Sequence, residues 1–402
     1  MVCTLGPFWP KRQLSSIKMA HLRQIVPSSL GFEDDRGLLF HHQVHVLPSL
    51  SPAHPQPWLI RIPEIFDTLA PEILCRLEAT PGKRLGLDYH WVGLPDPSQL
   101  QNHPIAKFIR WNLPVEHSWP CNPSKIEGFI EKASQALQAK FAARSPQAIF
   151  TGVLHPTSPD RYFRSLAGNL RGRMLQVFAP TRLHEVEEQD AERETLFCLV
   201  GKEGLYAGVQ SPKHCNGLFA GGSKFIDQNS PDTISRAGAK IAEALHYLRM
   251  HQSPLPAGSH WLELGACPGG MTSELLARKQ RVTAIDKSPL DPRLSGRPGL
   301  RFVHADVAEF QPEPNSVYDA LLNDMNGPPE ESIDHVRRLS KWLKPEGIVV
   351  FTLKLPKVED LDGPCALFDR IVKRAQSARL RLFAQTHLTY NRHEFTLFFR
   401  RT

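Results

Sequence analysis

The sequence predicts an α/β protein whose C-terminal part is a doubly wound parallel sheet with an antiparallel C-terminal edge strand. Three observations indicate this fold class. Over residues 233–402, apolar runs of strand length alternate with segments of helical spacing. The middle runs are short and continuously apolar, which is typical of strands covered by helices on both faces. The first run, 261–264, ends in a glycine-rich turn, Gly265-Ala-Cys-Pro-Gly-Gly270, that leads into a helical pattern.

Each element of this half is predicted from its own pattern. In chain order we expect a helix at 235–250, a strand at 261–264, a helix at 271–279, strands at 281–286, 300–304 and 318–323, a helix at 330–343, a strand at 347–355, a helix at 365–377, and a hairpin of 380–388 and 394–400. Ligands of such sheets bind at the carboxyl ends of the strands, so the residues that follow each run are the candidates for a site.

We expect three domains, because 402 residues exceed the size of one ordinary domain. The predicted bounds are 1–123 for an N-terminal domain of uncertain fold, 124–229 for a smaller α/β domain, and 230–402 for the doubly wound domain.

The N-terminal domain has weak periodicity at first. A strand is expected at 38–47, where His41, His42 and His45 stand without a carboxylate or cysteine at matching spacing, so we predict no metal site there. The segment 63–77 predicts one or two short helices, because its prolines suit first-turn positions.

The middle domain begins with a capping box, Ser124-Lys-Ile-Glu127, which predicts that a helix starts there. Its further elements are expected as a strand at 148–154, a helix at 161–175, and strands at 196–200 and 204–209. Residues 140–182 hold seven basic residues and one acid. Arginine suits forked contacts with phosphate. We therefore expect a basic face that binds RNA, with a solvated helix face as the alternative; it includes Arg161, Arg164, Arg171 and Arg173.

The composition is that of a globular protein, with 41% hydrophobic and 22% charged residues. No apolar run is long enough to predict a membrane span, and the first charges follow the apolar residues, the reverse of a secretory signal. The seven cysteines form no CxxC pair, so we expect free thiols and a cytoplasmic protein. The net charge of +7 permits a polyanionic partner. We expect no membrane partner, and a monomer or weak homodimer.

Acidic residues stand where three consecutive strands end. Asp286 ends the second strand, Asp306 follows the third, and Asp324 ends the fourth. The first suits ribose hydroxyls, and the second suits an adenine amino group. Glu263 interrupts the apolar first strand and is placed to reach the same ligand. The turn lacks the GxGxxG spacing that seats a pyrophosphate, so a smaller nucleoside ligand such as S-adenosylmethionine fits better.

Four titratable residues stand out around this pocket: Lys240, Asp324, Lys354 and Glu394. Lys354 lies inside an apolar strand, where a buried lysine is costly unless it reaches water at the end of the sheet. We expect burial and the second lysine to lower the pKa of Lys354 towards a value useful for a general base. The two carboxylates would orient the amines. Such a base suits the deprotonation of a hydroxyl that attacks a methyl group.

Several separate motifs together resemble the FtsJ-type ribose 2′-O-methyltransferases. They are Ser235-Arg-Ala-Gly-Ala-Lys240, Leu264-Gly-Ala-Cys-Pro-Gly-Gly270, Asp286, Asp306, Asn323-Asp-Met325, Leu353-Lys-Leu-Pro356 and Arg392-His-Glu394. The resemblance implies a Rossmann-like methyltransferase domain with S-adenosylmethionine as the methyl donor. It maps the family's Lys-Asp-Lys-Glu catalytic tetrad onto Lys240, Asp324, Lys354 and Glu394.

The turn and the Leu-Lys-Leu-Pro strand look most like the RlmM-type enzymes. Those enzymes methylate a cytidine ribose of bacterial large-subunit (23S) rRNA and carry a THUMP RNA-binding domain, which implies a THUMP-like middle domain here. The cofactor residues that the resemblance implies are Ala237, Glu263, Gly265, Cys267, Pro268, Gly269, Gly270, Asp286, Asp306 and Asp324. Three positions depart from the family pattern: Glu263 stands for Asp, Met271 for an aromatic residue and Ala237 for Ser.

Two other functions stay open on the sequence. A THUMP-containing RNA base methyltransferase would carry an Asn/Asp-Pro-Pro-Tyr-like loop after the fourth strand. Here Asn323-Asp-Met-Asn-Gly-Pro-Pro329 displaces the prolines and lacks the aromatic residue. A non-catalytic RNA-binding or ribosome-assembly protein that kept the fold would not need Lys240, Asp324, Lys354 and Glu394 intact. Methyl transfer to a ribose is therefore the favoured hypothesis.

Overall fold

The computed structural model describes residues 55–155, 161–178, 185–231, 233–356 and 358–402. The strand expected at 38–47, with His41, His42 and His45, lies outside these residues. Among the described helices, none combines the length and the apolar character needed to cross a bilayer.

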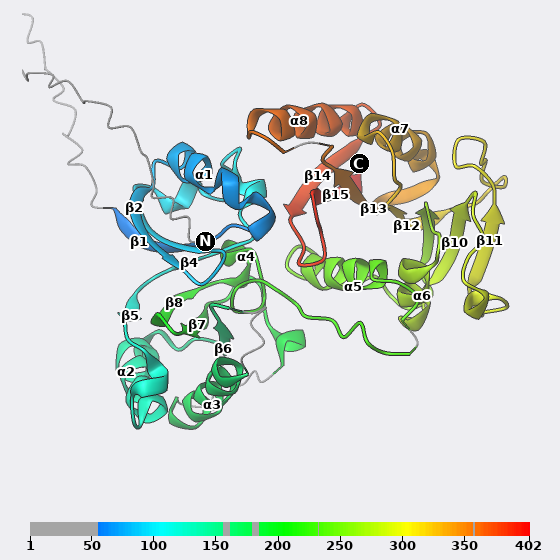
Figure 1. The fold of residues 1–402 in the computed structure, drawn as a ribbon. Coiled ribbons are helices and arrows are strands. Elements are labelled where there is room, and N and C mark those ends of the chain that lie inside the picture. Colours follow the sequence, from blue (N-terminus) through cyan, green and yellow to red (C-terminus); the bar gives the residue numbers. More distant parts are fainter. Residues whose placement is uncertain (1–54, 156–160, 179–184, 232, 357) are drawn as a thin grey trace, which may run out of the picture. The chain divides into compact units, whose positions relative to one another are not determined.

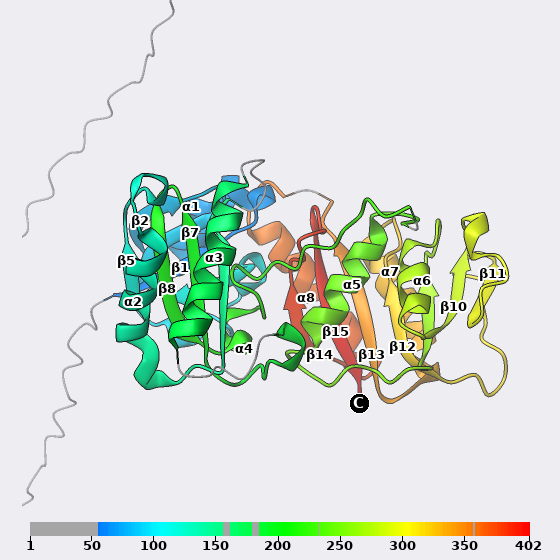
Figure 2. The same cartoon turned by 90° about the horizontal axis from the view of Figure 1, so that it is seen from below.

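The C-terminal half contains a seven-stranded sheet (Figures 1 and 2). Its strands are β9 (His260–Leu264), β10 (Arg281–Asp286), β11 (Leu300–His304), β12 (Tyr318–Asn323), β13 (Leu343–Lys354), β14 (Leu380–Thr386) and β15 (Glu394–Arg401). Their order is β11-β10-β9-β12-β13-β15-β14, and β9 to β13 pair in parallel. The strand order reverses direction between β9 and β12, the place where such sheets bind ligands.

Helices cover both faces of this sheet, which confirms the doubly wound fold. The helices are α5 (Ala237–Leu248), α6 (Gly270–Ala277), α7 (Pro329–Leu339) and α8 (Asp362–Gln376). Successive residues of β12 point to opposite faces: Leu321 shares a buried cluster with Ile333 of α7, and Leu322 shares another with Ile241 of α5. Figure 1 shows α5 and α6 on one face and α7 and α8 on the other.

The antiparallel strand is β15, which pairs with β13 on one side and with β14 on the other. It therefore lies one position inside the sheet edge, and β14 forms the edge itself.

The helix expected at 330–343 is shorter than predicted. α7 ends at Leu339, a 3-10 turn (η8, Ser340–Trp342) follows, and β13 begins at Leu343. Lys344 precedes a proline, and a residue in that position avoids the helical region of backbone space. The chain must therefore leave the helix before it reaches this residue.

The N-terminal half contains two four-stranded sheets. The first has the order β2-β3-β1-β4 and the second the order β5-β8-β7-β6. Their strands are β1 (Gln56–Arg61), β2 (Thr80–Leu85), β3 (Tyr89–Leu94), β4 (Trp111–Pro114), β5 (His117–Trp119), β6 (Ala148–Val153), β7 (Thr195–Gly201) and β8 (Gly204–Gln210). The helices are α1 (Ala70–Arg76), α2 (Phe129–Phe141), α3 (Tyr162–Val177) and α4 (Pro212–Cys215).

Short 3-10 turns connect these elements. They are η1 (Glu64–Leu69), η2 (Pro97–Gln99), η3 (Ala106–Phe108), η4 (Pro123–Lys125), η5 (Ala142–Arg144), η6 (Val186–Glu188) and, in the C-terminal half, η7 (Pro292–Leu294). Together η1 and α1 are the two short helices expected at 63–77. The domain bounds at 123/124 and 229/230 stay predictions; β5, which precedes Ser124, already pairs with β8 of the second sheet.

The predicted capping box at Ser124 is wrong. The side chain of Asn122 accepts a hydrogen bond from the Ser124 N–H (3.2 Å) and caps only the 3-10 turn η4. Helix α2 starts at Phe129, because Gly128 has a φ of 67°, a left-handed conformation that interrupts the helical path.

Candidate active site

The four residues of the predicted tetrad lie together at one edge of the seven-stranded sheet. Lys240 comes from α5, Asp324 directly follows β12, Lys354 ends β13, and Glu394 begins β15. The carboxyl ends of parallel strands meet at one edge, and the start of an antiparallel strand lies at that same edge. The register confirms this, since Lys354 pairs directly with Glu394.

Each carboxylate contacts both lysines. The Nζ atom of Lys354 donates to Oδ1 of Asp324 (2.7 Å) and to Oε2 of Glu394 (2.8 Å). The Nζ atom of Lys240 forms ion pairs with Oε1 of Glu394 (2.6 Å) and Oδ2 of Asp324 (3.4 Å). The two cations and two anions therefore alternate around a closed ring of ion pairs.

The pKa of Lys354 differs from the expectation. Burial is the largest single influence and lowers this pKa, but Asp324 and Glu394 together raise it further, so the net pKa lies above its ordinary value. The predicted lowering is therefore wrong for the protein without ligands. The pKa of Glu394 is raised by burial and lowered by Lys354 and Lys240, and the net shift is downward.

A cavity of about 580 Å³ opens beside the tetrad and includes Lys240, Asp324 and Lys354 in its wall. This volume lies within the usual range of small-molecule sites. Nine of the ten residues expected to bind the cofactor line it, namely Ala237, Glu263, Gly265, Cys267, Pro268, Gly270, Asp286, Asp306 and Asp324.

Gly269 is the expected cofactor residue that does not line this cavity. It has a φ of 104° and caps the start of α6, and a Cβ added there would lie 2.2 Å from a side-chain carbon of Leu294. Its place in the turn follows from backbone conformation and close packing.

Two further glycines bring backbone close to the cavity. Gly265 has a φ of 75°, and a Cβ there would lie 2.9 Å from the Met325 side chain. At Gly270 a Cβ would lie 2.1 Å from Oγ of Ser235, in the segment just before α5. The absence of side chains at these positions lets the turn, α5 and the loop after β12 approach one another.

Asp286 and Asp306 are held by backbone N–H groups. The two carboxylate oxygens of Asp286 accept from the N–H groups of Cys267 (2.9 Å) and Ser288 (2.8 Å). Asp306 accepts from the N–H of Ala308 (2.8 Å). Each oxygen keeps a second lone pair, so both side chains are oriented and still able to accept hydrogen bonds from a ligand.

Glu263 lines the cavity from β9 and is 2% exposed. Its Oε2 accepts a hydrogen bond from the Thr272 hydroxyl (2.7 Å). Burial raises its pKa to about 8, and the hydroxyl bond only partly opposes this shift. The carboxyl is therefore mostly protonated at neutral pH in the protein without ligands.

Replacement of Glu263 by Gln should change the pH dependence of stability. The raised pKa of the folded state means that wild-type stability is greatest below the unfolded pKa, near 4.5, and falls as the pH rises to about 8. Glu263→Gln removes this loss. Thermal unfolding at several pH values should show an advantage of the variant that grows over this interval; a constant difference at all pH values would contradict it.

The sequence interpretation did not assign five further residues of the cavity wall to the site: Lys287, Ser288, Val307, Met325 and Asn326. Each lies one or two positions after Asp286, Asp306 or Asp324, so proximity along the chain was the signal that could have identified them. Within the described ranges, no group of three or more His, Cys, Asp or Glu side chains is arranged to hold a metal ion.

The four arginines expected on the RNA-binding face differ in their surroundings. Arg161 and Arg164 are exposed. Arg171 donates to the carbonyl of Ile149 (2.8 Å) and is half-buried, and Arg173 forms an ion pair with Glu131 (2.8 Å). Arg171 and Arg173 therefore already have polar partners within this part of the chain.

Comparison with known proteins relates the chain to RNA methyltransferases. The family described as FtsJ-like methyltransferase matches residues 233–359. A ribosomal RNA large subunit methyltransferase M from Halorhodospira halophila is 30% identical over 272 residues, which cover 65% of this chain and 73% of that protein. Its counterpart from Shewanella frigidimarina is 29% identical over 164 residues, 40% of this chain and 44% of that protein.

Solved structures show weaker similarity. Fibrillarin from Methanococcus jannaschii, described as a pre-rRNA processing protein, has a TM-score of 0.33 at 15% identity, covering 55% of this chain and 85% of that chain. TrmN from Thermus thermophilus has a TM-score of 0.33 at 16% identity, covering 86% of this chain and 100% of that chain. These TM-scores are too low to support any argument about the fold or function of this chain.

Proposed function

This chain belongs to the family of FtsJ-like ribosomal RNA large subunit methyltransferases M, and from that premise we propose that it is an S-adenosylmethionine-dependent ribose 2′-O-methyltransferase of ribosomal RNA. The observation that carries the ribose assignment is the ring of Lys240, Asp324, Lys354 and Glu394 beside the cavity. A hydroxyl needs a base to become a nucleophile, and this ring holds an amine at the cavity wall.

The cavity fits the methyl donor. Gly265 and Gly270 let the turn pack closely against Met325 and Ser235 beside the cavity, and Asp286 accepts from backbone groups while it retains lone pairs for ribose hydroxyls. Asp306 is suited to an adenine amino group. When bound, S-adenosylmethionine supplies an activated methyl group together with a positive charge on its sulfur.

Lys354 acts as the general base in this proposal. Its Nζ atom accepts the proton of the 2′-hydroxyl, which leaves the oxygen electron pair free to take up the methyl group that a bound donor would supply. Asp324 and Glu394 fix the position of Nζ and stabilise the ammonium that results. Lys240 also pairs with both carboxylates, which weakens their stabilisation of the protonated form of Lys354.

The raised pKa of Lys354 in the protein without ligands is compatible with this role. A further positive charge in the cavity disfavours a second cation and lowers the pKa of the ammonium. Lys354 would then lose its proton preferentially when the methyl donor is in place.

RNA contact is assigned to Arg161 and Arg164, which are exposed on the basic part of the middle domain. Replacement of both by Gln should weaken RNA binding. The slope of log binding constant against log salt concentration should become shallower by about 1 for each arginine replaced. Filter binding over a salt series measures this slope. Arg173→Gln is the matched control, because Arg173 pairs with Glu131; equal slopes in all variants would refute the assignment.

Transfer of labelled methyl groups to rRNA from cells that lack the gene tests the function. After digestion to nucleosides, the label should appear as a ribose-methylated nucleoside of the large-subunit rRNA, and we propose 2′-O-methylcytidine. Label on a base would instead identify a base methyltransferase. RNA binding without transfer to free rRNA or to ribosomal particles would identify a non-catalytic protein.

A further inference from the structure

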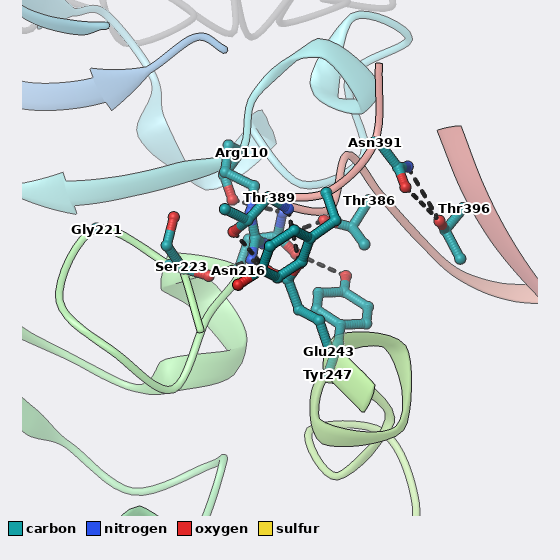
Figure 3. Close-up of polar contacts among 12 residues, drawn as sticks. Arg110, Asn216, Gly221, Ser223, Glu243, Tyr247, Thr386, Thr389, Asn391 and Thr396 are labelled. Carbon is teal, nitrogen blue, oxygen red and sulfur yellow. Dashed lines mark hydrogen bonds and ion pairs between the residues drawn. The ribbon is translucent and has the colours of Figure 1, made fainter. Parts of the chain in front are cut away.

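A buried ion pair joins the first N-terminal sheet to the catalytic half of the chain. Arg110, just before β4, donates to Oε1 of Glu243 on α5 at 2.8 Å. The two side chains are only 4% and 1% exposed. Figure 3 shows Arg110 and Glu243 facing one another at the centre of a group of polar side chains.

Glu243 also holds the loop between β14 and β15. Its Oε2 accepts from the Thr389 N–H (2.7 Å), and its Oε1 accepts from the Thr389 hydroxyl (2.7 Å). Arg110 in turn donates to the Thr386 hydroxyl (3.3 Å) and to the carbonyl of Gly222. Four segments that are distant in sequence therefore meet at one ion pair (Figure 3).

Two of these segments carry residues of the catalytic tetrad. Lys240 lies three residues before Glu243 on α5, which places the two side chains on neighbouring positions of the helix surface. Glu394 follows Thr389 by five residues, and Asn391 between them donates to the Glu394 carbonyl (3.2 Å). The Glu243 carboxylate therefore connects α5, which carries Lys240, to the loop that leads into Glu394.

Stability alone is a poor explanation for such a pair. Removing two charges from water is costly, and apolar residues of similar size often stabilise a core as well or better. Buried polar pairs are best attested as devices that fix one arrangement among several. Here the arrangement that depends on the pair is the distance between α5 and the β14–β15 loop.

We propose that Arg110 and Glu243 are positioning residues for methyl transfer. They fix the position of Lys240 relative to Glu394, so the geometry of the tetrad depends on a residue beside the first N-terminal sheet. This inference rests on the proposed function, since it concerns the same reaction. Neither residue lines the cavity of the tetrad, so they act through the segments that they hold.

The test compares full-length variants in the rRNA methylation assay. Glu243→Gln should lower kcat roughly tenfold while the dissociation constant of S-adenosylmethionine stays within about twofold. Because a displaced Glu394 raises the pKa of Lys354 less, the rise of kcat with pH should move to lower pH. Arg110→Gln should behave similarly, and the double variant should lose no more than either single one, as expected of a pair that acts as a unit.

Asp88→Asn is the matched control. Asp88 forms another buried ion pair, with Arg61 of the same sheet at 2.6 Å, and Arg61 holds the 221–223 segment, which contacts Arg110 but carries no residue of the tetrad. Its loss should lower the unfolding temperature and leave kcat and the pH profile unchanged. If Glu243→Gln does not fold, Thr389→Val removes one of the same hydrogen bonds without a charge change.

Two outcomes of the assay distinguish a failure of the positioning role from a failure of the proposed function. Unchanged kcat and pH profile in the folded Glu243 or Thr389 variant, with only a lower unfolding temperature, would overturn the positioning role. A wild-type protein that transfers no methyl group in the same assay would instead overturn the proposed function.

Discussion

Replacement of Lys354 by Met should reduce methyl transfer by roughly 10²- to 10⁴-fold, the contribution typical of a positioned general base. Methionine keeps most of the side-chain volume in β13 but cannot accept a proton. Cofactor affinity should not fall, because the glycine turn, Asp286 and Asp306 stay in place in the cavity wall and the lost ammonium no longer repels the positive charge of the donor. Single-turnover methylation and calorimetric titration with S-adenosylmethionine measure the two quantities.

Lys344→Met is the control for this variant. Lys344 belongs to the same strand but forms its ion pair with Asp319 at the opposite end, where it is half-exposed. Its replacement should leave the rate unchanged. A Lys354→Met protein that binds the cofactor and still transfers methyl groups at the wild-type rate would exclude Lys354 as the base.

Replacement of Glu394 by Gln should lower kcat roughly 10²-fold, because both lysines lose one of their two anionic partners and their positions are no longer fixed. The pH profile should also change. Glu394 raises the pKa of Lys354, so its loss lowers that pKa and moves the rise of kcat to lower pH. Measurement of kcat from neutral to alkaline pH tests both parts.

Glu346→Gln serves as the comparison, since Glu346 is exposed and lies in β13 far from the tetrad. A Glu394→Gln variant with a lower kcat but an unshifted pH profile would show that Glu394 does not act on the proton of Lys354. An unchanged kcat would remove Glu394 from the mechanism.

The fold of the catalytic half could be predicted because its strands are continuous apolar runs that only a sheet covered on both faces explains. The strand at 281–286, for example, begins and ends as expected. The first N-terminal sheet could not be predicted, since β2 is mostly exposed and has no apolar alternation. There, pairing with β3 imposes the strand, and this information is not local.

The grouping of the tetrad could be predicted from motif positions, but the sign of the Lys354 pKa could not. That sign depends on whether two carboxylates lie within hydrogen-bonding distance, which the registers of β13 with β12 and with β15 determine. The Arg110–Glu243 pair was missed for a related reason. Its partners are 133 positions apart and neither stands in a distinctive motif.

The place of β15 inside the sheet has a consequence for how the protein becomes active during synthesis. Because β15 separates β13 from β14, β14 leaves the ribosome first but cannot join the sheet until β15 has been made and inserted. Such non-local pairing delays folding. Glu394 enters with that same insertion, so the four charged side chains of the tetrad come together only once β15 has joined β13.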